Sequence, residues 1–535
     1  MTLTGDSSDY VAEHIAPTLQ KALVALSKAR PADPRTFLAE KLIELKPPPP
    51  TKEPPLVPTE PQPTATELLA QIHGGKKSCV ALIEERLARI DAVNPILNCC
   101  TEVLYDSALA AARAVDAKIA QGLPLKRLEG LPIVVKINID VAGTLSTAAT
   151  PALAEWRPTK TAPVMEALLA EGAIVLAKTG MPELAVGMRG GSLLHGLPKN
   201  PFSLEHNAGG SSTGTGVSVA AGIVPCGLGS DTAGSLRIPA SCNGGVGMRP
   251  SKGRWSGLGV VPCSSLRDTA GPMGATVTDV ALLDAIVMGE PTVTAASLLG
   301  IKVVVAEDWI AEGPPIAPET REGLELAITA FRNAGASVTT DAGFAEMKST
   351  AKATWEPPLP VAIENCHGDM QAYLDYHGTD LPEGLRTVEG LLPSMAGGDN
   401  PLGSILRGFF AAPPKRQPSM EAFEAAISTR DEGIAATEEA YKAFFRKSKA
   451  TVVLMPVFPK EPTHLGDPMK SGIGAMLNEG AYTSHLCMHK GVPAIVLPTK
   501  AKWKMSGVPV GIMLYGIDDR EVLSVALALE EALKS

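Results

Sequence analysis

The stretch Gly209 to Pro239, which reads GGSSTGTGVSVAAGIVPCGLGSDTAGSLRIP, determines how we interpret the rest of the chain. It opens with a turn of glycine, serine and threonine, 209–216, whose small residues permit unusual backbone angles and expose N–H groups and hydroxyls. The pattern then predicts a short helix at 212–221 and a buried strand at 223–229. A second tight turn runs from 230 to 235. We expect both turns to reach one edge of a sheet, a placement that suits a nucleophile and its partner.

Composition narrows the class of protein. The chain has 535 residues with 45% hydrophobic content, which predicts one large domain with an appendage. A net charge of −9 without a basic block argues against nucleic acid and anionic membranes as partners. The eight cysteines lack CxxC spacing and a histidine cluster, so we expect neither a zinc site nor a disulfide framework. With no apolar run of about 18 residues, we predict a cytoplasmic protein with no metal, no cofactor and no membrane contact.

Residues 1–46 are predicted to form a small all-α helical hairpin. Apolar residues recur at helical spacing on both sides of the break at Arg30-Pro31-Ala32, and Asp33 and Pro34 are suited to start the second helix. The segment resembles the Dpy-30 motif, a hairpin that pairs into a four-helix dimer and docks an amphipathic helix. The resemblance therefore implies a homodimer and a docking role; the alternative is an ordinary helical extension of the main domain.

The proline-rich residues 47–63 are predicted to be a spacer rather than an SH3 ligand, and 64–535 to be the main domain. Helical and strand patterns alternate through most of this domain, which indicates α/β layering. Residues 345–430 look irregular and are expected to cover the site or to vary the pocket. A lysine, Lys136, closes the apolar strand pattern that begins at Leu131.

Two interpretations of the chemistry are open at this point. Gly210 to Gly214 matches the GxSxG nucleophile elbow, which would make Ser212 a nucleophile served by His485 or His489, but the residues before it lack a strand pattern. The other interpretation needs no histidine. Ser235 would be the nucleophile beside backbone N–H groups, Ser211 would relay its proton, and a neutral Lys136 would be the base.

From about Thr64 onward the chain resembles the amidase signature family. The similar segments are GLPIVVKINIDVAG, GGSSTGTGVSVAAGIVP and GSDTAGSLRIPASCNGGVGMRPSKGR. The resemblance implies a mixed β-sheet covered by helices on both faces. It also implies a triad of Lys136, Ser211 with a cis peptide, and Ser235. An oxyanion hole and substrate-binding group would comprise Thr232, Ala233, Gly234 and Ser212.

Further segments, among them ATPALAEWRPTKTAPV and GRWSGLGVVPCSSLRDTAGPM, are similar to indoleacetamide and mandelamide hydrolases. This similarity implies hydrolysis of a primary aryl or arylalkyl amide, a small-molecule substrate. Four features depart from the family pattern: Ile137, Ala233, Thr213 and the stretch that begins at Gly187. If Ala233 had positive φ, its methyl group would cost about 1 to 2 kcal/mol. The alternatives are a docking protein that uses the fold only as a scaffold, and an amidotransferase A-type subunit.

Overall fold

The computed structural model describes residues 55–188, 190–312, 315–340, 343, 366–397, 407–408, 410–411, 420–465 and 492–534. The predicted hairpin 1–46 and both elbow histidines, His485 and His489, lie outside these ranges. Leu56–Ser535 form one compact unit. In the part of the chain that the structure describes, no helix is both long and apolar enough to span a membrane.

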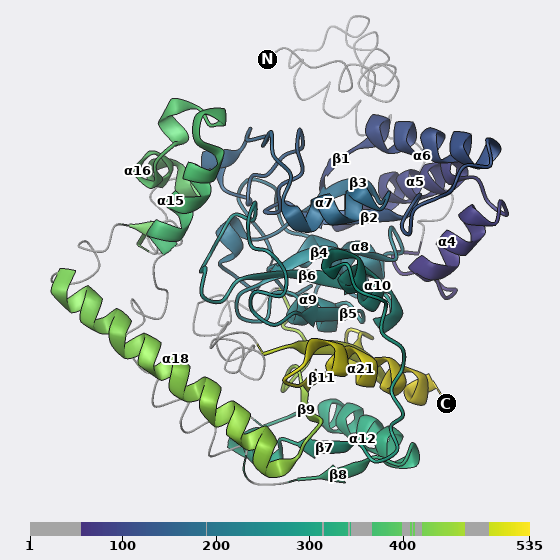
Figure 1. The fold of residues 1–535 in the computed structure, drawn as a ribbon, viewed down its shortest axis with the longest axis vertical. Coiled ribbons are helices and arrows are strands. Elements are labelled where there is room, and N and C mark those ends of the chain that lie inside the picture. Colours follow the sequence, from purple (N-terminus) through teal and green to yellow (C-terminus); the bar gives the residue numbers. More distant parts are fainter. Residues whose placement is uncertain are drawn as a thin grey trace, which may run out of the picture. The chain divides into compact units, whose positions relative to one another are not determined.

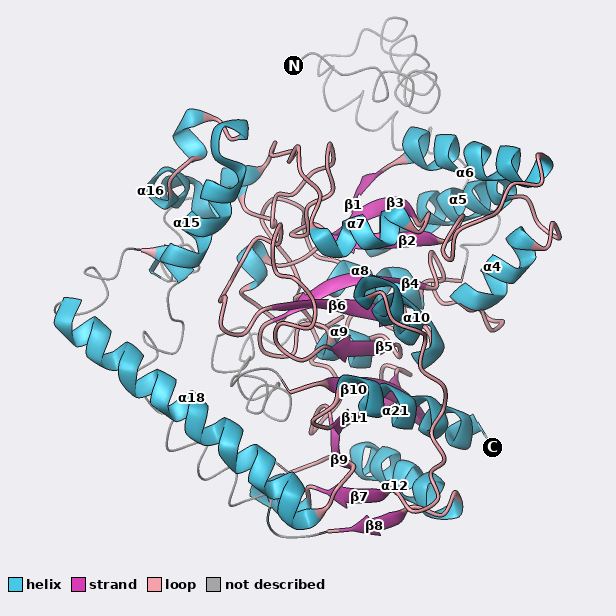
Figure 2. Cartoon of the chain, in the orientation of Figure 1, coloured by secondary structure: helices cyan, strands magenta, loops and turns pink. Residues whose placement is uncertain are grey.

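A mixed sheet is the centre of this unit (Figures 1 and 2), as predicted. The described strands run in the order β1-β3-β2-β4-β6-β5-β10-β11-β9-β7-β8. The first pairing, β1 with β3, is antiparallel. The next two, β3 with β2 and β2 with β4, are parallel. All pairings from β4 through β6, β5, β10 and β11 to β9 are antiparallel. The last two pairings, β9 with β7 and β7 with β8, are parallel. The strand bounds are β1 Cys100–Val103, β2 Pro132–Lys136, β3 Ile174–Thr179, β4 Cys226–Asp231, β5 Val246–Arg249, β6 Thr269–Gly274, β7 Lys302–Val305, β8 Ser337–Thr339, β9 Val452–Pro456, β10 Ala494–Lys502 and β11 Pro509–Tyr515.

Helices cover both faces of the sheet because successive strand residues point to opposite sides. In β2, Val134 belongs to a core cluster with Val217 of α8, whereas Val135 belongs to a separate cluster with Val164 of α7. The helix bounds are α4 Ala65–His73, α5 Cys79–Leu97, α6 Tyr105–Ala120, α7 Pro163–Ala170, α8 Thr213–Ala220, α9 Arg237–Cys242, α10 Val277–Met288, α11 Glu307–Glu312, α12 Pro318–Asn333, α15 Cys366–His377, α16 Val388–Leu391, α18 Met420–Ser448 and α21 Asp519–Lys534. The two-sided burial explains why the β2 sequence is apolar almost throughout.

Two local predictions need correction. The strand predicted at 223–229 is β4, Cys226–Asp231, because Pro225 precedes it and its last residue, Asp231, pairs with Thr269. The stretch 345–430, predicted to be irregular, contains α15 and the start of α18 among its described residues. Proline and glycine separate the helices in this region, so its composition did not indicate that it contains helical segments.

Residues 56–62 pack on the main unit. The guanidinium of Arg89 donates to the carbonyl of Leu56 at 3.0 Å, and that of Arg86 donates to the Gln62 side chain at 3.2 Å. A Cβ added at Gly222 would lie 2.6 Å from the ring of Pro58. The second half of the predicted spacer 47–63 therefore contacts α5 and the turn at Gly222 that follows α8.

Candidate active site

Strand β2 delivers Lys136 to the edge of the sheet where the two glycine and serine turns meet. The lysine side chain is fully buried, and its Nζ lies 2.7 Å from Ser211 Oγ and 2.9 Å from Ser230 Oγ. Asn138, two residues further along, donates from Nδ2 to the same Ser230 hydroxyl at 3.1 Å. Lys136 is therefore held between two hydroxyls, one on each turn.

Burial changes the chemistry of this lysine. Removal of the ammonium from water lowers the pKa of Lys136 from 10.5 to about 7, although the carboxylates of Asp231 and Asp268 act in the opposite direction. An unperturbed lysine is almost entirely protonated at neutral pH and cannot accept a proton. At a pKa of about 7 a large fraction is neutral, so Lys136 can act as a general base.

The first turn places Ser211 beside this base. The Gly210–Ser211 peptide bond is cis, and Gly209 has φ of 71°. A Cβ at Gly210 would lie 3.0 Å from the Gly187 carbonyl, so glycine allows close approach of the two loops there. Ser211 is fully buried and lies within hydrogen-bond distance of the lysine.

Ser212 has a different environment from the one that an elbow nucleophile needs. Its hydroxyl donates to the Ser230 carbonyl at 3.1 Å and accepts from the Ser230 N–H at 3.2 Å, and the side chain is fully buried. No strand precedes it between 200 and 210. Ser212 therefore joins the two turns, and its N–H donates to the Ser235 carbonyl at 3.1 Å.

Asp231 fixes the second turn. Its carboxylate accepts from the N–H groups of Gly234 at 2.7 Å and Leu236 at 3.1 Å, and it pairs with Arg237 and Arg249, each at 3.0 Å. Burial by itself raises the pKa of Asp231, but the two guanidinium groups outweigh this effect and hold it well below its usual range. Asp231 is thus a permanent anion that sets the conformation of residues 232–236.

The geometry of this turn leaves donors beside Ser235. Gly234 has φ of 121°, whereas Ala233 does not have a positive φ. The alanine in place of a common glycine therefore brings no left-handed strain. The Gly234 N–H is used by Asp231, and within the described ranges no acceptor takes the N–H of Thr232, Ala233 or Ser235. Ser235 is 9% exposed, whereas Ser211 and Ser212 are fully buried. Among these three serines, only Ser235 keeps any exposed surface.

Two of the noted departures from the family pattern have a local explanation. The Thr213 side chain faces Gly190, which has φ of 81°. The threonine fits there because position 190 has no Cβ, which would lie 2.2 Å from Thr213 Oγ1. The Thr213 hydroxyl donates to the Gly209 carbonyl at 2.7 Å. Ile137 is fully buried in a small apolar cluster with Ala149 and Met181. An aspartate there would need a new polar partner.

Three contributing residues were not singled out from the sequence. Ser230 and Asn138 bind or brace Lys136, and Asp268 accepts from the Thr232 hydroxyl at 2.5 Å. Burial raises the pKa of Asp268, although it also accepts the N–H groups of Cys263 and Ser264. For Asp268 the sequence signal was the DTAG repeat, present at 231–234 and again at 268–271; Ser230 and Asn138 had none. Among the described residues, no group of three or more His, Cys, Asp or Glu could hold a metal ion.

Comparisons with known proteins identify what this architecture resembles. A family model described as Amidase matches residues 81–523, and a Dpy-30 motif model matches residues 6–47. Mandelamide hydrolase of Pseudomonas putida is 29% identical over 483 residues, covering 88% of this chain and 91% of that enzyme. The A-type subunit of the glutamyl-tRNA(Gln) amidotransferase from Lachnospira eligens is 29% identical over 490 residues, covering 88% of this chain and 98% of that relative. A crystal structure of an amidase has 27% identity and a TM-score of 0.67, with 88% of this chain and 100% of that one covered.

Proposed function

The chain belongs to the amidase family and is a hydrolase of amide C–N bonds, and from this premise we propose that it converts an aryl or arylalkyl primary amide to the acid and ammonia through an acyl-enzyme on Ser235. The similarity to mandelamide hydrolase over nearly its whole length supports this substrate class. The amidotransferase alternative is the second candidate, because the match to the A-type subunit is equally extensive. That role would need partner chains, so ammonia release by the purified protein alone favours the hydrolase.

In the proposed acylation step, neutral Lys136 accepts the proton of Ser211 as Ser211 accepts the proton of Ser235. Ser235 Oγ forms a bond to the amide carbonyl carbon, and the carbonyl electron pair moves to oxygen. The N–H groups of Thr232, Ala233 and Ser235 are the donors available to that oxyanion, and the Gly234 N–H would have to leave Asp231 to join them. The C–N bond then breaks, and the proton returns through Ser211 to the departing ammonia.

Deacylation reverses the roles of the same groups. Water attacks the ester carbonyl of acylated Ser235 and loses its proton towards Ser211 and Lys136. The second tetrahedral intermediate collapses with release of the acid and return of a proton to Ser235 Oγ. The single observation that carries the proposal is the 2.7 Å contact between Ser211 and a buried lysine whose pKa is about 7.

We further propose that residues 1–46 pair two copies of the chain and can dock an amphipathic helix. Residues 47–63 link this hairpin to the amidase domain, 64–535. We also propose that the protein is cytoplasmic. The Dpy-30 motif match at 6–47 supports the pairing and docking roles. The cysteines support the proposed localisation, since none of the seven that the structure describes is in a disulfide.

An ammonia-release assay tests the catalytic proposal. Purified protein and its Ser235→Ala variant are incubated with mandelamide, indoleacetamide and aliphatic primary amides of similar size. We expect the wild-type protein to release ammonia from the aryl amides in excess of the aliphatic ones, and the variant to release none above background. Equal rates for wild type and variant would refute the role of Ser235, and no release from any amide would favour the scaffold alternative.

A further inference from the structure

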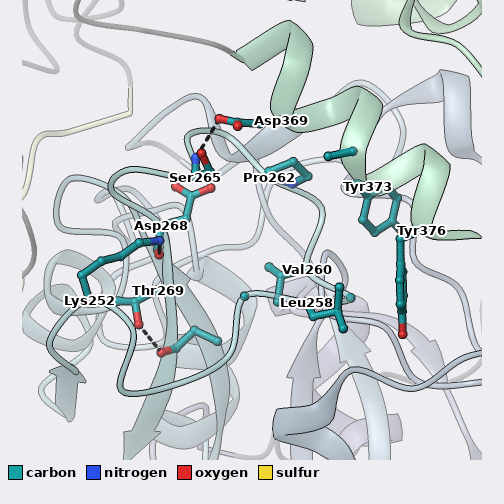
Figure 3. Close-up of a pocket in the computed structure, with 14 residues that line it drawn as sticks. Lys252, Leu258, Val260, Pro262, Ser265, Asp268, Thr269, Asp369, Tyr373 and Tyr376 are labelled. Atoms are coloured by element: carbon teal, nitrogen blue, oxygen red, sulfur yellow. Dashed lines mark hydrogen bonds between the residues drawn. The ribbon is translucent and has the colours of Figure 1, made fainter. Parts of the chain in front are cut away.

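A cavity of about 280 Å³ lies between the segment 252–270 and helix α15 (Figure 3). Lys136, Ser211 and Ser235 are not among its lining residues. Its lining has two distinct ends. Lys252, Asp268 and Asp369 form a charged end, and Leu258, Val260, Tyr373 and Tyr376 form an apolar and aromatic end.

The charged end combines one hydrogen-bond donor group with two acceptor groups. Lys252 Nζ donates to the Asp268 carbonyl at 2.6 Å and has no second acceptor among the described residues. Asp369 accepts the Ser265 N–H through Oδ2 at 2.8 Å, while Oδ1 is unpartnered within the same part of the chain. Burial lowers the pKa of Lys252 and the Arg249 guanidinium acts in the same direction, whereas the carboxylates of Asp268 and Asp369 oppose the shift.

The aromatic end is held in place from behind. The Tyr373 hydroxyl donates to Asp140 at 3.0 Å and accepts from Trp156 Nε1 at 3.1 Å. His377 lies 2.9 Å from the same buried Asp140, and its ring packs edge-on against Tyr373 and Tyr376. These contacts anchor α15 to the loop that follows β2. The rings therefore form a fixed wall, suited to pack against an aromatic ring.

The cavity is connected to the reacting groups by one hydrogen bond and one strand pairing. Asp268, which lines the cavity, accepts the Thr232 hydroxyl at 2.5 Å, and Thr232 belongs to the oxyanion turn. Ala270, also in the lining, pairs across the sheet with Ser230, the residue bound to Lys136 Nζ. A ligand that moves Asp268 or Ala270 acts on the groups that hold the oxyanion turn and the base.

We infer that this cavity is a second binding site for the neutral aromatic primary amide itself, separate from the reacting serine and coupled to it through Asp268. The choice of ligand class rests on the proposed function. The aromatic ring lies against Tyr376, Tyr373 and Leu258. The amide carbonyl accepts from Lys252, and the amide N–H groups donate to Asp369.

The charges explain why an amide is preferred to the acid product. The acid would bring a carboxylate close to Asp268 and Asp369, two like charges, and among the lining residues of this partly desolvated site only Lys252 is a cation. A neutral carboxamide has both an acceptor and donors, and it uses the lysine and the carboxylate together. The site therefore distinguishes substrate from product by charge.

Titration calorimetry of the Ser235→Ala protein with phenylacetamide and with phenylacetate tests the inference without turnover. We expect two binding events, one at the catalytic site and one in this cavity, and Lys252→Met and Tyr376→Ala should each weaken only the second about tenfold, because each removes one end of the site. Tyr376→Phe, which keeps the ring, and Lys76→Met, which removes an exposed lysine elsewhere, are the matched controls and leave binding unchanged. Phenylacetate binds at least about tenfold more weakly, and Asp369→Asn narrows that gap because it removes a like charge.

The inference is overturned if the Lys252 and Tyr376 variants bind phenylacetamide as tightly as their controls, or if phenylacetate binds as well as the amide. Failure of the proposed function has a different signature. If wild-type protein releases no ammonia from phenylacetamide while binding still depends on Lys252 and Tyr376, the cavity is a ligand site and the catalytic proposal is wrong.

Discussion

Lys136 should give the pH profile of amide hydrolysis a single ionisation near 7. Burial outweighs the opposing carboxylates of Asp231 and Asp268 and lowers the pKa of Lys136 from 10.5 to about 7, a net change that corresponds to roughly 5 kcal/mol in favour of the neutral amine. Because the neutral form is the base, kcat/KM rises with pH and levels off about one unit above the pKa. At pH 5 we expect about one hundredth of the plateau value.

The decisive comparison is between Lys136→Ala and a variant of the neighbouring buried lysine. Lys178 on β3 is also fully buried, burial lowers its pKa to about 8, and its ammonium binds the Ile139 carbonyl. Initial rates of ammonia release from pH 5 to 10 should show Lys136→Ala reduced about 10²- to 10⁴-fold and without the ionisation.

Lys178→Met should retain the ionisation near 7, with folding of both variants checked by thermal unfolding. The reasoning is refuted if Lys136→Ala keeps an ionisation near 7, or if Lys178→Met loses it.

Three further outcomes follow from the structure. Asp231→Asn should lower the free energy of unfolding by about 3 to 5 kcal/mol, measured in urea, because it leaves two buried guanidinium groups without their anion; a change below about 1 kcal/mol would contradict this. Gly190→Ala should unfold at lower temperature than wild type, and Thr213→Gly in the same chain should restore part of the loss, since the new methyl group meets Thr213 Oγ1; no rescue would mean that the two positions are not coupled. Deletion of residues 1–54 should convert a dimer to a monomer in light scattering, with amide hydrolysis retained. Deletion of 1–63 also removes the packing of Leu56 and Gln62 and should lower the stability of the protein. A full-length monomer would contradict the pairing role.

The sequence predicted the fold class because the local signals agreed. Local backbone conformation could be predicted from the apolar run that ends in Lys136, from the small-residue turn at Gly209 and from the DTAGS turn. The predicted mixed sheet with helices on both faces is confirmed. The order of the strands was not predictable. Strand β5, Val246–Arg249, pairs with β10, Ala494–Lys502, and no pattern in either segment identifies a partner so far away in the chain.

The site was only partly predictable for a related reason. Lys136, Ser211 and Ser235 stand at the ends of recognisable elements, whereas Ser230 and Asn138 act through a hydroxyl and an amide that look ordinary in the sequence. The effect of Ala233 depended on a backbone angle. That angle is positive at the next residue, Gly234, so the alanine is tolerated.

The most direct test of the central claim is where a serine-directed fluorophosphonate attaches. The wild-type protein is labelled, digested and mapped by mass spectrometry, with Lys136→Ala treated in parallel. We predict that the label is on Ser235, the partly exposed serine of the turn, and that Lys136→Ala labels far more slowly because the base is missing. Label on Ser212, or equal labelling of both proteins on Ser235, would contradict the account.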